Sequence, residues 1–363
     1  MIDFITEKIN CWDRIRKDTK PIYLYGMGDG AVKIMSVFRR YGIEIKGIFA
    51  SDDFVRGHYF AGYKVMKLSE VEEIEDDFSV VLAFAAGYDD LVERIINISR
   101  RHTLYVPDVP VIGSGIFTLE YCKDHEEELE TAYSLLADEQ SKNVFASIVN
   151  FKISGDIKHL ENITTPREEI YKKIIKPNLN EHYVDLGAYN GDTIKEFMEI
   201  TKNRYVRIYG VEPDKKNFRK LERAFSEKGG IELYNSAAWC TDTELPFSSK
   251  AGRNSSLSNT GATSEMTSAR SVDSILKGRE ASLIKMDVEG AEREALWGCS
   301  QTIMRYKPRL MVALYHRTED IFELPILINK LNPKYKLYIR HQLYIPAWET
   351  NLYAVNDSSS SLG

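Results

Sequence analysis

Cysteines are few and long apolar runs are missing, and these two absences exclude several classes of protein. The four cysteines, Cys11, Cys122, Cys240 and Cys299, lie far apart and form no C-x-x-C pair. Neither a zinc ribbon nor a disulfide framework fits that spacing. No run approaches the roughly 18 apolar residues of a membrane helix, and the N-terminus lacks the apolar stretch of a signal peptide. We therefore expect a cytoplasmic protein with no membrane partner.

The chain also lacks an excess of positive charge. Lys and Arg number 48 against 54 Asp and Glu, so the formal net charge is −6. Without a global positive field we expect no nucleic-acid partner. Hydrophobic residues make up 43% and charged residues 28% of the chain, which excludes a largely disordered protein. At roughly 150 residues per domain, the 363 residues predict two domains, or one domain with a large addition.

The first part of the chain has the pattern of a Rossmann-like unit. An apolar run at 21–26 leads into a glycine-rich turn and a helical pattern at 31–41, and a second strand ending in acidic residues follows. This order predicts a Rossmann-like accessory domain over residues 1–115. If its turn holds a nucleotide or nucleotide sugar, the contacting residues are Gly26, Gly28, Gly30 and Asp52. The alternative is that these glycines only make a tight turn between strand and helix.

A helical bridge and a second, longer α/β pattern follow. Residues 116–180 lack strand alternation and predict two or three helices, whereas 181–356 contain seven apolar runs. The last two runs have no helix between them, so we expect an antiparallel pair. The fold class predicted is α/β, with a seven-stranded, mostly parallel sheet like that of class I methyltransferases after a smaller Rossmann-like domain. Residues 357–363 read as a flexible tail.

The expected strands of this second unit are 183–186, 205–211, 231–235, 282–287, 309–315, 335–340 and 351–355. The expected helices are 192–202, 214–228, 271–277 and 291–306.

The strongest chemical signal lies where the first of these strands turns into a helix. In V-D-L-G-A-Y-N-G-D-T, Gly187 and Gly191 let the backbone approach a ligand, and Asp185 can accept from an ammonium or hydroxyl group. Glu212 ends the next strand 21 residues beyond Gly191, where a carboxylate accepts both ribose hydroxyls of a bound adenosine. Tyr189 stands where the pattern E/D-x-G-x-G-x-G has its middle glycine. These features predict an adenosine-type cofactor.

Further residues at the strand ends complete the predicted cofactor site. Asn217 lies at a helix start near the ribose or the base, and Ala237 and Ala238 lie where an adenine edge is expected. Asp287 and Glu289 follow the fourth strand, at the carboxyl edge where open α/β sheets bind ligands.

Taken together, these motifs resemble the FkbM-type family of S-adenosylmethionine-dependent methyltransferases over about residues 180–355. The resemblance implies methyl transfer from S-adenosylmethionine, usually to a hydroxyl of a sugar or natural product. It also implies that Asp185, Gly187, Gly191 and Glu212 bind the cofactor, and that Asp287 and Glu289 lie between cofactor and acceptor. The motifs are V-D-L-G-A-Y-N-G-D-T (184–193), G-V-E-P-D (210–214), N-S-A-A-W (235–239), R-N-S-S-L (253–257) and I-K-M-D-V-E-G-A-E (284–292).

The acceptor side needs a group that takes a proton. We expect His316 to serve as base, because a neutral imidazole near pH 7 suits proton removal. Asp287 is the second catalytic candidate, and His341 is a third base candidate placed with the substrate-binding residues. Residues 247–270 are polar and read as a long loop over the ligand edge, where Arg253 and Asn254 would contact the substrate beside Glu289.

Several alternatives stay open at this point. The first domain could make the chain an NAD(P)-dependent oxidoreductase, or the chain could be a nucleotide sensor without catalysis. Asp287, Glu289 and His316 could share a divalent metal, although we favour no metal because the sequence shows no further ligand cluster. The accessory domain or the bridge could also form a homodimer.

Overall fold

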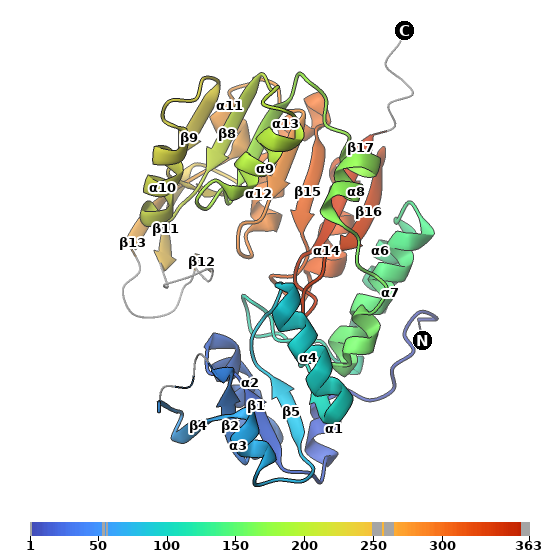
Figure 1. Cartoon of the computed structure of the whole chain (residues 1–363). Helices are drawn as coiled ribbons and strands as arrows, with labels where there is room; N and C mark the ends of the chain where they lie inside the picture. The colour runs from blue at the N-terminus through green and yellow to red at the C-terminus, as the bar shows by residue number, and fades with distance from the viewer. Residues whose placement is uncertain (1, 53–54, 56, 249–255, 258–264, 357–363) are drawn as a thin grey trace.

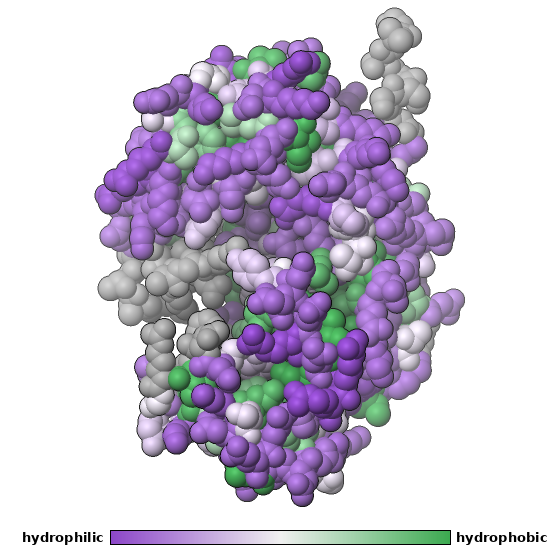
Figure 2. All heavy atoms as spheres, viewed as in Figure 1, coloured by the Kyte–Doolittle hydropathy of each residue, from purple (hydrophilic) through white to green (hydrophobic). Residues whose placement is uncertain are grey.

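The computed structural model describes residues 2–52, 55, 57–248, 256–257 and 265–356. Two α/β units, each built on a twisted sheet, are joined by a set of helices (Figure 1). The face shown in Figure 2 is mostly hydrophilic, with hydrophobic residues in small separate patches. Within the described ranges, no helix combines the length and apolar character needed to cross a membrane.

The N-terminal unit contains a six-stranded sheet in the order β3-β4-β2-β1-β5-β6. All neighbouring strands are parallel except the β3–β4 hairpin. The parallel part therefore has the order of a Rossmann-like sheet, as predicted. Its elements are α1 (Cys11–Lys17), β1 (Ile22–Tyr25), α2 (Asp29–Tyr41), β2 (Gly47–Ala50), β3 (Tyr59–Phe60), β4 (Tyr63–Lys67), α3 (Leu68–Glu72), β5 (Ser79–Leu82), α4 (Asp89–Arg101) and β6 (Thr103–Tyr105).

The connecting helices pack against the edge of the second sheet. Arg340 on the edge strand forms an ion pair with Asp138, and the Ser141 hydroxyl accepts a hydrogen bond from the backbone N–H of Ile339 at 3.0 Å. One hydrophobic core cluster includes buried residues of both units and of these helices. The elements are α5 (Leu119–Asp124), α6 (Glu126–Ser134), α7 (Glu139–Ser154), η2 (Ile157–Leu160), α8 (Arg167–Ile170) and η3 (Tyr171–Ile175).

The C-terminal unit confirms the predicted seven-stranded sheet, with the order β16-β17-β15-β14-β7-β8-β9. Its strands are parallel except β17, which runs antiparallel to both β15 and β16. Its main elements are β7 (His182–Leu186), α9 (Asp192–Ile200), β8 (Arg207–Val211), α10 (Lys215–Phe225), β9 (Ile231–Tyr234), α11 (Val272–Leu276), β14 (Leu283–Met286), α12 (Glu292–Gly298), α13 (Ser300–Tyr306), β15 (Arg309–Ala313), α14 (Asp320–Leu331), β16 (Tyr335–His341) and β17 (Thr350–Asn356).

Three features of this unit differ from the predictions. The expected helix 291–306 is two helices, α12 and α13, which meet at Cys299. α14 was not predicted. The expected loop 247–270 includes strand β13 (Glu265–Arg270), which pairs with β11 (Thr243–Ser248) and β10 (Ala237–Ala238) in a small sheet that also contains β12 (Ser256–Leu257). β13 is polar and buries only alternate residues such as Thr267 and Ala269, so its sequence resembles a loop.

The carboxyl edges of the two large sheets meet. Ala86, just beyond β5, pairs with Ile345 in the connection between β16 and β17, and Gly87 packs against the ring of Tyr344. The backbone N–H of Ile112 donates to the carbonyl of His316, just beyond β15, at 3.0 Å. The N-terminal unit therefore lies against the edge where a parallel sheet binds its ligands (Figure 1).

Candidate active site

A pocket of about 310 Å³ opens at the carboxyl edge of the C-terminal sheet. It is lined by the turn after β7 and by the ends of β8, β14 and β15. Three predicted residues, Asp185, Gly191 and His341, are not part of its lining. The predicted residues that line it are Gly187, Tyr189, Glu212, Asn217, Ala237, Ala238, Asp287, Glu289 and His316.

The two glycines of the first turn make room for neighbouring parts of the chain. Gly187 has φ +80°, and a Cβ there would lie 1.8 Å from the main-chain oxygen of Asp287. Gly191 has φ +87°, and a Cβ there would lie 2.3 Å from the ring of Phe225. Packing therefore explains the missing side chain at both positions, and Gly187 lines the pocket whereas Gly191 does not.

Glu212 lies at the pocket wall with its carboxylate held by two backbone N–H groups. Tyr189 donates to Oε2 and Asp214 donates to Oε1, each at 2.9 Å. Burial raises the pKa of Glu212 to about 7, although these two hydrogen bonds oppose the shift. The Tyr189 backbone has a φ of 48°, so the turn aims its N–H at the acid on the neighbouring strand.

Asp185 lies behind the pocket, so the prediction of a direct ligand contact is not supported by its position. Its side chain is buried, and the Thr193 hydroxyl donates to Oδ2. Burial raises the pKa of Asp185, while the ammonium group of Lys285, 3.6 Å from Oδ1, opposes that rise. Asp185 therefore fixes the start of α9 and the position of Lys285.

Lys285 is a pocket residue that the sequence analysis missed. Its Nζ lies 3.6 Å from Asp185 Oδ1 and 3.6 Å from Asp287 Oδ2. Burial favours the neutral amine, but the two carboxylates outweigh that effect and raise the pKa of Lys285. The sequence feature that could have identified it is the single charged residue in the otherwise apolar strand L-I-K-M (283–286). The ammonium holds Asp287 at the end of β14.

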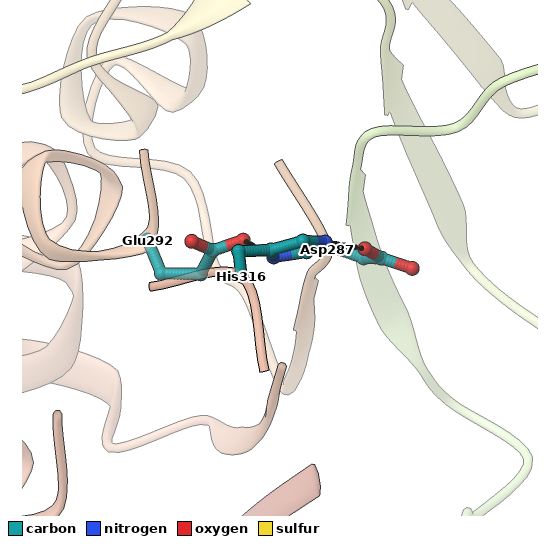
Figure 3. A group of neighbouring side chains, drawn as sticks. All are labelled: Asp287, Glu292 and His316. Atoms are coloured by element: carbon teal, nitrogen blue, oxygen red, sulfur yellow. Dashed lines mark hydrogen bonds and ion pairs between the residues drawn. The ribbon is translucent and has the colours of Figure 1, made fainter. Parts of the chain in front are cut away.

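His316 lies in a line of charged groups, with its ring between Glu292 and Asp287 (Figure 3). Nδ1 is 2.8 Å from Glu292 Oε1, and Nε2 is 3.4 Å from Asp287 Oδ1. Glu289 Oε2 lies 3.6 Å from Nε2. Burial favours the neutral ring, but Glu292, Glu289 and Asp287 together raise the pKa of His316 to about 10. These carboxylates therefore favour the protonated imidazole, whereas the base expected from the sequence requires a neutral ring.

The carboxylates around His316 differ from one another. Burial favours the neutral form of Asp287, yet Lys285 and His316 hold its pKa below the usual value, and the Tyr315 hydroxyl donates to Oδ1 at 3.3 Å. Burial raises the pKa of Glu289 to about 7. Glu292 Oε1 also accepts from the backbone N–H of Val288 at 2.9 Å. Asp287, Glu292 and His316 each offer an atom within 4.8 Å of the other two, close enough to hold a metal ion.

His341 does not line the pocket, so its predicted substrate contact is corrected. Its ring is 1% exposed, and its Nδ1 lies 3.0 Å from the Thr350 hydroxyl. Burial lowers the pKa of His341 to about 4. The side chain therefore joins β16 to the start of β17 as a neutral ring, whereas the next residue, Gln342, lines the pocket.

Three aromatic side chains that the sequence analysis did not select also line the pocket. The ring of Trp348 is nearly parallel to those of Tyr315 and Tyr344, with centroids 6.3 and 6.1 Å away. Tyr344 and Trp348 come from the connection between β16 and β17, which contacts the N-terminal unit. Flat apolar faces beside a few polar groups are typical of small-molecule sites.

Residues from outside the C-terminal unit complete the wall. Val111 follows β6, and its carbonyl accepts from Lys33 Nζ on α2 at 2.8 Å. Arg167 on α8 pairs with Glu196 at 3.0 Å. Neither Val111 nor Arg167 is part of a recognisable sequence motif. Their position at the pocket could not be predicted, because it depends on how the units pack.

Two predicted substrate contacts cannot be placed relative to the pocket. Arg253 and Asn254 fall outside the described residues. Phe247, at the start of that segment, does line the pocket.

The glycine-rich turn of the N-terminal unit is explained by packing at two of its positions. A Cβ on Gly30 would lie 2.4 Å from the Ala83 carbonyl, and one on Gly26 would lie 2.7 Å from the Phe84 ring. Gly28 has open space, and Asp52 is exposed just beyond β2. Packing therefore accounts for Gly26 and Gly30, as expected of a tight connection between strand and helix, and the nucleotide site stays a prediction.

Comparison with known proteins gives one family and one extended structural similarity. Residues 185–345 match the model of the methyltransferase FkbM domain. The crystal structure of methyltransferase FkbM from Methylobacillus flagellatus is similar, with a TM-score of 0.73 and 20% identity over 98% of this chain and 96% of that one. The two proteins therefore share a fold across both units.

Weaker similarities cover about half of the chain. Fibrillarin from Aeropyrum pernix, solved with natively bound S-adenosyl-L-methionine, has a TM-score of 0.34 and 17% identity over 51% of this chain and 72% of that one. An rRNA methylase from Streptococcus thermophilus has a TM-score of 0.34 and 13% identity over 52% of this chain and 92% of that one. The comparison with curated proteins gave no match.

Proposed function

Since residues 185–345 match the model of the methyltransferase FkbM domain, we propose that this chain transfers a methyl group from S-adenosylmethionine to a hydroxyl group of a sugar or another small acceptor. The observation that carries the proposal is the position of Glu212. Its carboxylate lies at the end of β8 and on the pocket wall, fixed by the N–H groups of Tyr189 and Asp214. From there it can accept both hydroxyl groups of a ribose.

The residues that line the pocket fit S-adenosylmethionine. Glu212 and Asn217 would hold the ribose side, Ala237 and Ala238 would border the adenine, and the turn containing Gly187 would receive the amino-acid end. Asp287 and Glu289 place negative charge in the same pocket, which suits a cation. When bound, S-adenosylmethionine supplies an activated methyl group on a positively charged sulfur.

The chain's own task is then to position an acceptor oxygen and to receive its proton. Asp287 is the residue we assign to the proton, because Lys285 and the Tyr315 hydroxyl fix its carboxylate at the pocket wall. The acceptor oxygen would bond to the methyl carbon as the sulfur–methyl bond breaks and S-adenosylhomocysteine leaves, and the hydroxyl proton would pass to this carboxylate. The positive charge of the protonated His316 ring, which lies next to both carboxylates, reduces the repulsion between Asp287 and Glu289. Tyr344 and Trp348 offer flat surfaces for the acceptor.

A screen with isotopically labelled S-adenosylmethionine tests the proposal. Hydroxylated acceptors such as glycans and nucleotide sugars are expected to gain label, and acceptors whose hydroxyls are blocked are not. Alkali-stable label in the product distinguishes an ether from a methyl ester. Label that appears only on nitrogen or on a carboxylate would overturn the assignment to hydroxyl groups.

A further inference from the structure

The lining of the C-terminal pocket changes from apolar to charged along the sheet. Ala237 and Ala238, which follow the edge strand β9, line the part where the proposed function places the adenine. Toward the other edge, α8, α9 and the connection before β17 contribute Arg167, Glu196 and Glu349. This second part offers charge to the far end of a ligand whose base lies on the alanines.

Arg167 is held by contacts with three other parts of the chain. Its Nη1 lies 3.0 Å from Glu196 Oε2 on α9, and its Nη2 lies 3.5 Å from Glu349 Oε2, just before β17. Its Nε donates to Oε1 of Gln342, just after β16, at 2.9 Å. A guanidinium has five N–H groups, so contacts with the described residues leave two of them for a ligand.

Arg167 is also the most accessible positive charge of the pocket. Among the lining residues that the structure describes, only Lys285 and His316 also carry positive charge. Their side chains are 14% and 2% exposed, against 41% for Arg167. A flat guanidinium also binds a carboxylate through two parallel hydrogen bonds, a geometry that an ammonium group does not offer. Arg167 is therefore the residue best suited to an anionic group of a ligand.

The strand order places Arg167 near the predicted ribose contact. Glu196, its partner, belongs to α9, which the turn at Gly187 joins to β7. β7 pairs directly with β8, and β8 leads to Glu212. A ligand whose ribose is bound at Glu212 therefore has only to cross the end of β7 to reach the charged part of the pocket.

We propose that Arg167 binds the carboxylate of S-adenosylmethionine, with Glu196 and Glu349 fixing the guanidinium for that contact. The assignment rests on the proposed function, because it names the group of the cofactor that Arg167 recognises. The amino-acid end of the cofactor also carries an ammonium group, so its net charge is zero and the two glutamates do not repel it as a whole. A guanidinium fixed in advance loses little conformational entropy on binding. The connecting helices would thereby supply a cofactor contact through α8.

Calorimetry with S-adenosylhomocysteine and with its decarboxylated form tests the assignment. The two ligands share the adenosine, the sulfur and the ammonium group and differ only in the carboxylate. Arg167→Gln is expected to weaken the binding of S-adenosylhomocysteine by about 10-fold to 150-fold, the range for one hydrogen bond to a charged group. Its affinity for the decarboxylated ligand is expected to stay within about threefold of the wild type, because that ligand has no carboxylate to lose.

The matched control is Arg279→Gln. The Arg279 side chain is 41% exposed, as that of Arg167 is, and it pairs with Glu232 but does not line the pocket. This variant is expected to bind both ligands like the wild type.

The decarboxylated ligand also shows whether the pocket of the Arg167→Gln protein is intact. An equal loss of affinity for both ligands would show that Arg167 only supports the pocket, and unchanged affinity for both would remove it from the cofactor site. A wild type that binds the two ligands equally well would contradict the carboxylate contact and leave the proposed methyl transfer standing. A wild type that binds neither ligand would contradict the proposed function itself.

Discussion

Replacing Glu212 with glutamine is expected to weaken the binding of S-adenosylhomocysteine at least about 100-fold. A hydrogen bond to a charged group contributes about 1.5–3 kcal/mol, and an unpaired buried donor costs about 1–3 kcal/mol. Glutamine removes the charge and one of the two acceptor oxygens and leaves one backbone N–H unpaired, so the summed loss reaches the 2.7 kcal/mol or so that corresponds to 100-fold. In the wild type both backbone N–H groups, of Tyr189 and Asp214, donate to the carboxylate. The glutamine NH₂ group would face one of them and leave it without an acceptor. Isothermal titration calorimetry measures the change.

The matched control is Glu232→Gln on β9, whose carboxylate pairs with Arg207 and Arg279 and does not line the pocket. This variant is expected to bind S-adenosylhomocysteine within about threefold of the wild type. Equal affinity of the Glu212→Gln protein and the wild type would remove Glu212 from the cofactor site.

The same residue predicts a pH dependence. Burial raises the pKa of Glu212 to about 7, and only the ionised carboxylate accepts both hydroxyls. The ionised fraction therefore grows from about one tenth at pH 6 to about nine tenths at pH 8. The affinity for S-adenosylhomocysteine should rise by up to about tenfold over that interval in the wild type. Glu212→Gln, which has no charge to lose, should show a flatter profile, and identical profiles for the two proteins would contradict this explanation.

Replacing Asp287 with asparagine is expected to lower kcat by about 100-fold to 10,000-fold, the range for loss of a positioned acid or base. The amide cannot take the acceptor proton, and the Lys285 ammonium loses one of its two partners. The measurement uses labelled S-adenosylmethionine and an acceptor from the screen. Binding of S-adenosylhomocysteine should change less than tenfold, because its contacts with Glu212 remain.

Asp242→Asn provides a control for this variant, because Asp242 accepts hydrogen bonds from the backbone N–H of Ser271 and the hydroxyl of Ser274 and is not part of the pocket lining. Its kcat should stay within about threefold of the wild type. A comparable kcat for Asp287→Asn would show that another group receives the proton.

Most of the C-terminal sheet could be predicted because its strands are apolar runs separated by helical periodicity. β14 and β15 are examples in which the pattern and the observed strand agree within one or two residues. β13 could not be predicted, because it is polar and is a strand only through its pairing with β11. The break between α12 and α13 lies beside Gly298, where a Cβ would lie 2.0 Å from the Trp239 carbonyl, so the chain there is in close contact with a segment distant in sequence.

The candidate site also contains residues that could be predicted from the sequence and others that could not. Glu212, Asp287 and Glu289 could be selected because acids at the carboxyl ends of parallel strands meet at one edge. The charge state of His316 could not, because it depends on three carboxylates that only the folded chain brings around the ring. Tyr344 and Trp348 lie in a connection without a motif. Their place at the pocket depends on the pairing of Ala86 with Ile345.

The central claim is that the C-terminal pocket binds S-adenosylmethionine, and calorimetry of the unmodified chain tests it most directly. S-adenosylhomocysteine is expected to bind one molecule per chain with a dissociation constant in the micromolar range, which corresponds to about 8 kcal/mol, and NAD is expected to give no comparable heat. No heat with S-adenosylmethionine or S-adenosylhomocysteine, together with clear binding of NAD, would contradict the account.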